Sequence, residues 1–131
     1  MAFDTRSWIV AGVDQFNRLE FMEAHDSWEH VWLTKPGAEA LFAQGLIQLA
    51  AAYLHIKRGT SPQGTLRLFN SALRKLAPFD HGFCGVDRSR VIDAASAHRE
   101  RLARDGRVRL AEDEYPRLAM IGAEERPSLE V

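Results

Sequence analysis

The chain has a single cysteine, Cys84, among its 131 residues. A disulfide within the chain is therefore excluded, and we expect a protein of a reducing compartment, the cytoplasm. Long apolar runs are also missing, because the longest, at residues 45–56, is interrupted by polar side chains and is too short to cross a bilayer. Charged residues near the start argue against the apolar core of a signal peptide; they are Asp4, Arg6 and Asp14.

Net charge is almost absent, because the chain has 17 Lys and Arg residues and 18 Asp and Glu residues. Such a chain has no global field that would attract nucleic acid or an anionic membrane, so we expect neither as a partner. The basic residues gather late, at residues 99–109, but Glu100 and Asp105 interrupt them and favour a solvated helix face. With 46% hydrophobic and 27% charged residues, the composition predicts one soluble globular domain with its own core.

Familiar catalytic motifs are lacking as well. The zinc motif H-E-x-x-H does not occur, and residues 25–30 resemble the inverted motif H-x-x-E-H but are one residue too long. The Glu-x-x-His pairs of di-iron bundles are missing from the same region. The glycines lack the spacing of a phosphate-binding loop. We therefore do not expect a multinuclear metal centre, and Cys84 reads as an ordinary small hydrophobe.

What the sequence does contain is helical periodicity, which predicts an all-α array of about five helices. The expected helices are given by approximate ranges: residues 5–18, 20–33, 37–58, 62–77 and 88–105. We place a break near Leu19, because one unbroken helix would turn Phe16 away from the aromatic face that follows. The short segment at residues 34–37 predicts that the second and third helices form a central hairpin. Gly12, in the middle of the first helix, indicates a close helix crossing.

We expect a single domain in which residues 1–106 form the helical body and residues 107–131 form an extended tail. Tyr115 and Leu118 are the residues expected to dock this tail on the body. The last residues of the chain are expected to be mobile.

The chemically informative stretch is residues 16–32, with the sequence F-N-R-L-E-F-M-E-A-H-D-S-W-E-H-V-W. His25 and Glu29 lie four residues apart and therefore share one helix face. The third expected helix is apolar almost all round, and its polar exceptions fall on one stripe: Gln44, Gln48 and His55. Across a short turn, Gln48 and His55 are expected to join His25 and Glu29 in a single polar cluster.

The same stretch, with Q-G-L-I-Q-L-A-A at residues 44–51, resembles the family known as domain of unknown function 309. The resemblance covers residues 16–76. Arg18, Met22 and Asp26 depart from the glycine, aromatic residue and glutamate that the family often has there. The resemblance implies a small all-helical protein whose activity is not established.

Three interpretations of the cluster remain open: a buried network that fixes helix register, a ligand pocket, and a catalytic or single-metal site. The catalytic candidates are His25 and Glu29, and a single divalent metal would be held by His25, Glu29 and His55. The remaining ligand-binding candidates are Glu23, Asp26, Trp28, Trp32, Gln44, Gln48 and His55. We therefore predict a binding or interaction module, with a small metal-dependent hydrolase as the alternative. A small-molecule ligand and a homodimer are left open, and no cofactor is expected beyond that metal.

The remaining histidines are expected to be less informative. His30 is expected on the opposite face of its helix as a solvated pair with Asp26. His81 and His98 are expected to be structural residues with satisfied hydrogen bonds.

Overall fold

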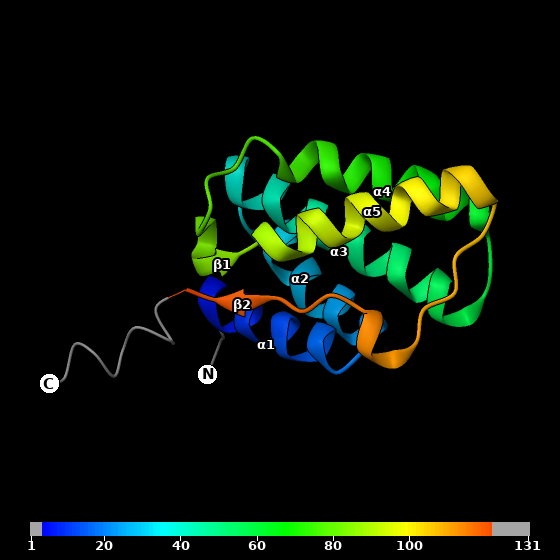
Figure 1. The fold of residues 1–131 in the computed structure, drawn as a ribbon. Coiled ribbons are helices and arrows are strands. Elements are labelled where there is room, and N and C mark those ends of the chain that lie inside the picture. The colour runs from blue at the N-terminus through cyan, green and yellow to red at the C-terminus, as the bar shows by residue number, and fades with distance from the viewer. Residues whose placement is uncertain (1–3, 122–131) are drawn as a thin grey trace, which may run out of the picture.

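The computed structural model describes residues 4–121 of the chain and confirms the all-α architecture. Its helices are α1 (Thr5–Asn17), α2 (Phe21–Thr34), α3 (Gly37–Arg58), α4 (Pro62–Leu76) and α5 (Ser89–Asp105). Two short 3-10 turns, η1 (Phe83–Gly85) and η2 (Glu112–Glu114), lie in the connecting segments. An antiparallel pair of two-residue strands joins β1 (Val86–Asp87) to β2 (Ala119–Met120). Each helix packs against the next one along the chain, with α4 and α5 on one side of α3 and α1 with β2 on the other (Figure 1).

The expected break between the first two helices occurs at Leu19, whose φ of 64° lies in the left-handed region. The N–H groups of Arg18 and Glu20 donate to the last carbonyls of α1, so the helix end is satisfied without a glycine. Lys57, at the far end of α3, donates its ammonium to Leu19 O at 2.9 Å. This contact ties the α1–α2 turn to the end of the central helix.

The α2–α3 connection is also as short as expected. Lys35 is extended at the end of α2, Pro36 follows it, and Gly37 reverses the chain with a φ of 66°. Because the turn is so short, α2 and α3 run antiparallel and pack along their length, which confirms the central hairpin.

Tyr53 of α3 lies at the centre of an aromatic core. It is fully buried, and its ring contacts rings from α1, α2, α4, α5 and the C-terminal segment at centroid distances of 5.2 to 6.0 Å. These partners are Phe16, Phe21, Phe69, His98 and Tyr115. Aromatic packing from the other four helices and the C-terminal segment therefore converges on the central helix.

Gly12 allows α1 and α2 to approach closely. A Cβ atom at this position would lie only 2.1 Å from Nε1 of Trp28, which is fully buried between the helices. The indole N–H of Trp28 donates to Ile9 O at 3.3 Å. The side-chain amide of Gln15 lies 2.6 Å from Ser27 Oγ and supplies a second polar link between the two helices. The close crossing expected from Gly12 is thus confirmed.

The chain beyond α5 passes the α3–α4 turn and returns along α1 to β2 (Figure 1). Tyr115 and Leu118 are only 9% and 3% exposed. Asn17 holds this segment with two hydrogen bonds of 2.8 Å, donating from Nδ2 to Leu118 O and accepting from Leu118 N at Oδ1. The predicted mobility of the last residues concerns residues 122–131, which lie outside the described range. In residues 4–121, no helix combines the length and apolar content that a bilayer span requires.

Candidate functional site

His25, Asp26 and Glu29 form a compact surface cluster on α2. Each contributes one potential ligand atom, and these atoms all lie within 4.8 Å of one another. His25 Nδ1 is 3.4 Å from Asp26 Oδ1, and the two side chains are 31% and 68% exposed. Glu29 is half-buried. The cluster is therefore at least partly accessible to solvent.

The structure divides the predicted constellation, because the polar residues of α3 have their partners elsewhere. Gln48 Oε1 accepts a hydrogen bond from Lys75 Nζ of α4 at 3.1 Å, and the same ammonium donates to Ser71. His55 Nδ1 is hydrogen-bonded to Thr60 Oγ1 at 3.0 Å, in the α3–α4 turn, and His55 does not join the cluster on α2. Expecting His55 beside His25 was wrong, because the end of α3 that carries it packs beside the start of α4.

Several large apolar side chains of α2 and α3 are exposed. Met22, Trp32 and Leu33 of α2 are 43%, 40% and 70% exposed, and Leu41 of α3 is 51% exposed. Among the described residues, the only other large hydrophobic side chain with comparable exposure is Val10. The spacing of Met22, Asp26, Glu29 and Leu33 places apolar and acidic groups on one helix face. We call Met22, His25, Asp26, Glu29, Trp32 and Leu33 together the outer face of α2.

The other predicted ligand-binding residues lie in three different environments. Trp28 is fully buried against Gly12 and belongs to the core, so a surface ligand would not reach it. Phe21 is a core residue as well. Glu23 is exposed on α2, and Gln44 is half-buried on α3. Of the aromatic residues in the motif, Trp32 is the one that offers its ring to solvent.

His30 does not pair with Asp26 as expected. Its ring stacks on Trp8 of α1, with centroids 3.7 Å apart and planes inclined by 6°. Asp26 instead lies beside His25. The expectation was wrong because His30 is turned toward α1, where a flat aromatic surface is available.

Tyr53 and His98 form a buried polar pair, joined by a 2.8 Å hydrogen bond between α3 and α5. Burial lowers the pKa of His98, Arg101 acts in the same direction, and Glu114 opposes them. Burial also raises the pKa of Tyr53. His98 therefore has the structural role expected of it. The signal for its partner was weak, because Tyr53 lies in a mostly apolar stretch of the expected third helix.

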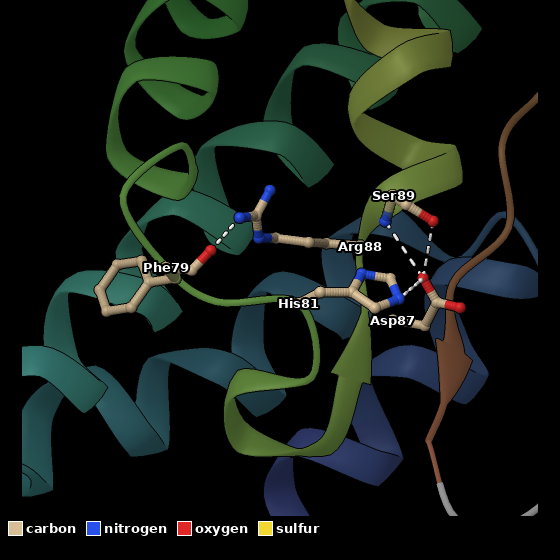
Figure 2. A network of polar contacts seen from close by, with 5 residues as sticks. All are labelled: Phe79, His81, Asp87, Arg88 and Ser89. Atoms are coloured by element: carbon tan, nitrogen blue, oxygen red, sulfur yellow. Dashed lines mark hydrogen bonds and ion pairs between the residues drawn. The ribbon is translucent and has the colours of Figure 1, made fainter.

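A polar network ties the α4–α5 loop to the start of α5 (Figure 2). Asp87 Oδ1 accepts hydrogen bonds from Ser89 N at 3.2 Å and Ser89 Oγ at 2.9 Å, and it lies 3.1 Å from His81 Nε2. The hydrogen bonds from Ser89 lower the pKa of Asp87, and His81 acts in the same direction. Arg88 donates from Nη2 to the carbonyl of Phe79. These bonds connect the loop to the first residue of α5, whose N-cap residue, Arg88, makes no side-chain capping bond, so we assign the network a structural role.

Cys84 lies in η1 with a φ of 56°. Burial raises the pKa of its thiol to about 11, and the nearby Glu39 carboxylate adds to this effect. The thiol is therefore protonated at neutral pH and a poor nucleophile.

The fold and the cluster define a small all-α protein with five successively packed helices and a histidine–carboxylate group on the surface of the second. Residues 9–68 of the chain match the family described as Domain of unknown function (DUF309), which confirms the resemblance seen in the sequence. The match begins within α1, includes all of α2 and α3, and ends within α4. A comparison with proteins of curated function found no match.

Proposed function

We propose that this protein is a binding module, and that the outer face of α2 docks onto a protein partner with Lys or Arg side chains. The observation that carries the proposal is the combination of exposed Met22, Trp32 and Leu33 with the carboxylates of Asp26 and Glu29 on one face. Apolar groups supply contact area at such interfaces, and charges select the partner. Tryptophan is among the side chains most often found as interface anchors, so we assign this role to Trp32.

Charge complementarity specifies the partner. Helix α2 carries three carboxylates, Glu23, Asp26 and Glu29, and contains no Lys or Arg. A basic segment flanked by apolar residues would place its cations against these carboxylates and its apolar ends against Met22 and Leu33. Such an interface would form quickly at low ionic strength and more slowly as salt is added.

A synthetic amphipathic peptide, with lysines at its centre and leucines at both ends, tests this proposal. We expect its titration into the ¹⁵N-labelled protein to shift amide resonances along α2. Trp32→Ala should weaken binding by about tenfold or more, because an anchor residue is truncated. Asp26→Asn/Glu29→Gln should weaken binding and reduce its salt dependence.

The matched control is Asp93→Asn/Glu100→Gln, which removes two carboxylates from α5 instead. We expect this variant to bind the peptide like the wild type. Equal losses in the two double variants, or shifts that avoid α2, would reject the outer face of α2 as the binding surface.

A second candidate function is binding of a single divalent cation, favoured by the three ligand atoms within 4.8 Å of one another. One imidazole and two carboxylates suit Zn²⁺ or Mn²⁺. Three protein ligands would leave a position for water, as the metal-dependent hydrolase alternative requires. Calorimetric titration with Zn²⁺ should show one site that Glu29→Gln weakens and Glu23→Gln, outside the cluster, does not. Equal affinity in all three proteins would reject the site.

Either function implies that the cluster contributes little to folding. Glu29 has no hydrogen bond or ion pair to another residue in the described range. We therefore expect both Glu29→Gln and Glu29→Ala to unfold within about 0.5 kcal/mol of the wild type in urea. A loss of several kcal/mol on Glu29→Ala would instead support an architectural cluster.

A further inference from the structure

A second concave site lies where the α3–α4 turn meets the segment that follows α5. The cavity has a volume of ≈ 200 Å³. Its polar lining includes His55, Thr60, Arg107 and Arg109, and its apolar lining includes Ile56 and Leu102. In Figure 1 the chain descends from the end of α5 past this turn, which brings residues far apart in the sequence to the same place.

The charge at this site is positive. Two guanidinium groups, those of Arg107 and Arg109, line the cavity, and no Asp or Glu does so. Neither guanidinium has a hydrogen bond or ion pair to another residue between positions 4 and 121. Arg104, only a few residues earlier, is by contrast paired with Asp105 at 3.0 Å. Two unpaired cations beside a concave surface attract an anion and pair with carboxylate or phosphate oxygens.

The remaining lining adds a directed polar group and an apolar floor. The hydrogen bond between His55 Nδ1 and Thr60 Oγ1 fixes the imidazole and leaves Nε2 for a ligand. Ile56, Leu102 and Val108 line the same cavity and would cover an apolar body. A neighbouring hollow shares Leu102 and Pro62 with the first and extends it along α4.

We propose that this cavity binds a small organic anion. Arg107 and Arg109 hold its carboxylate or phosphate group, and Ile56, Leu102 and Val108 contact a short apolar body. The volume of ≈ 200 Å³ lies below the usual range for drug-sized ligands, which favours a short chain over a nucleotide. The site shares no residue with the outer face of α2, so this proposal is independent of the function proposed there.

Four probes test the proposal on the full-length ¹⁵N-labelled chain: hexanoate, hexyl phosphate, hexan-1-ol and inorganic phosphate. We expect saturable shifts of the Gly59, Thr60 and Val108 amides with hexanoate or hexyl phosphate, and the tighter of the two identifies the anionic group. Hexan-1-ol should bind at least about tenfold more weakly, because it lacks the charge. Inorganic phosphate should also bind more weakly, because it has no apolar body.

The variant Arg107→Gln/Arg109→Gln should weaken binding of the preferred probe by about tenfold or more. Both side chains are exposed, so the fold is expected to be retained. The matched control Arg67→Gln/Arg90→Gln removes two exposed arginines from α4 and α5 outside the cavity and should bind like the wild type. Val108→Trp should block binding by filling the cavity without any change in charge.

Two sets of results would overturn the proposal. In the first, neither anionic probe shifts the three amides in a saturable way. In the second, the control variant loses as much affinity as Arg107→Gln/Arg109→Gln, which would indicate that the anion is attracted by the overall charge and not bound in this cavity. Inorganic phosphate binding as tightly as hexyl phosphate would overturn the assignment of an apolar body.

Discussion

The indole of Trp28 occupies the space that any side chain at position 12 would need. A Cβ atom there would lie 2.1 Å from Nε1 and 2.4 Å from Cε2, and the fully buried ring cannot move aside without opening the core. We expect Gly12→Ala to lower the free energy of unfolding by about 1–3 kcal/mol, measured in urea, despite the higher helix propensity of alanine.

Gly64→Ala is the matched control in another helix. A Cβ there would meet Ser61 Oγ at 2.5 Å, but Ser61 is exposed and its hydroxyl can rotate away. This variant should be neutral or stabilising by up to about 1 kcal/mol. Wild-type stability in Gly12→Ala would show that α1 and α2 are not packed as tightly as described.

His98 should make stability depend on pH. Its pKa in the folded protein lies below the ordinary value of 6.5, chiefly because of burial. As the pH falls below about 6.5, the unfolded chain takes up the proton first, so unfolding becomes easier. Stability is thus fully present above about pH 6.5 and declines as the pH approaches the lower pKa of the folded state. Urea midpoints between about pH 7.5 and 5.5 should fall more steeply for the wild type than for His98→Gln, and parallel profiles would contradict this.

Residues near one another in the sequence could be placed together in advance, and distant ones could not. The four-residue spacing of His25 and Glu29 was sufficient to put them on one face, because a helix fixes that geometry locally. The pairing of Tyr53 with His98 depends on how α3 packs against α5, across 45 residues. For the same reason the sequence did not reveal that Arg107 and Arg109 would meet His55.

At the scale of elements, Asn17 hydrogen-bonds the C-terminal segment to the end of α1. Its side chain satisfies both the N–H and the C=O of Leu118, each at 2.8 Å. Asn17→Ala should cost about 1–3 kcal/mol, because two partly buried backbone groups lose their partner. Hydrogen exchange at the Leu118 amide should accelerate accordingly.

Asn70→Ala, on the exposed side of α4, provides the comparison. Asn70 makes one contact, accepting from Arg99 at 3.3 Å, and is exposed. It should change stability by less than about 0.5 kcal/mol. Similar effects of the two substitutions would mean that the hydrogen bonds of Asn17 do not specifically stabilise the C-terminal segment.

The helix boundaries were predictable because each has a local cause. Pro36 follows the end of α2, Gly59 ends α3 with a φ of 69°, and Pro62 begins α4. The strands β1 and β2 were not foreseen, since two residues carry no periodic signal. Their pairing, Val86 with Met120 and Asp87 with Ala119, exists only because the distant segment returns to this point.

At the scale of the whole molecule, we propose that the helical body and the C-terminal segment fold as one unit. The ring of Tyr115 contacts those of Phe21 and Tyr53, with centroid distances of 5.7 and 5.9 Å. Leu118, three residues further along the chain, is also buried. Truncation after Ile121 should therefore preserve cooperative unfolding. Truncation after Gly106 removes three buried side chains, those of Tyr115, Pro116 and Leu118, and should cost roughly 3–5 kcal/mol. Equal thermal melts of the two truncated proteins would place the folding boundary at residue 106 instead.

The bond between Asn17 and Leu118 spans 101 residues of chain. During synthesis, α1 is the first of the five helices to be made. Leu118, which bonds to Asn17 at the end of α1, follows about 5–20 s later at ordinary elongation rates. Phe16 and Phe21 can pack on Tyr53 well before then, because α1, α2 and α3 are close neighbours in sequence. The nascent chain thus passes through a stage in which these helices are assembled while the place of Tyr115 and Leu118 is still uncovered. Among residues 4–121, the segment that covers the end of the first helix is thus synthesised after all five helices.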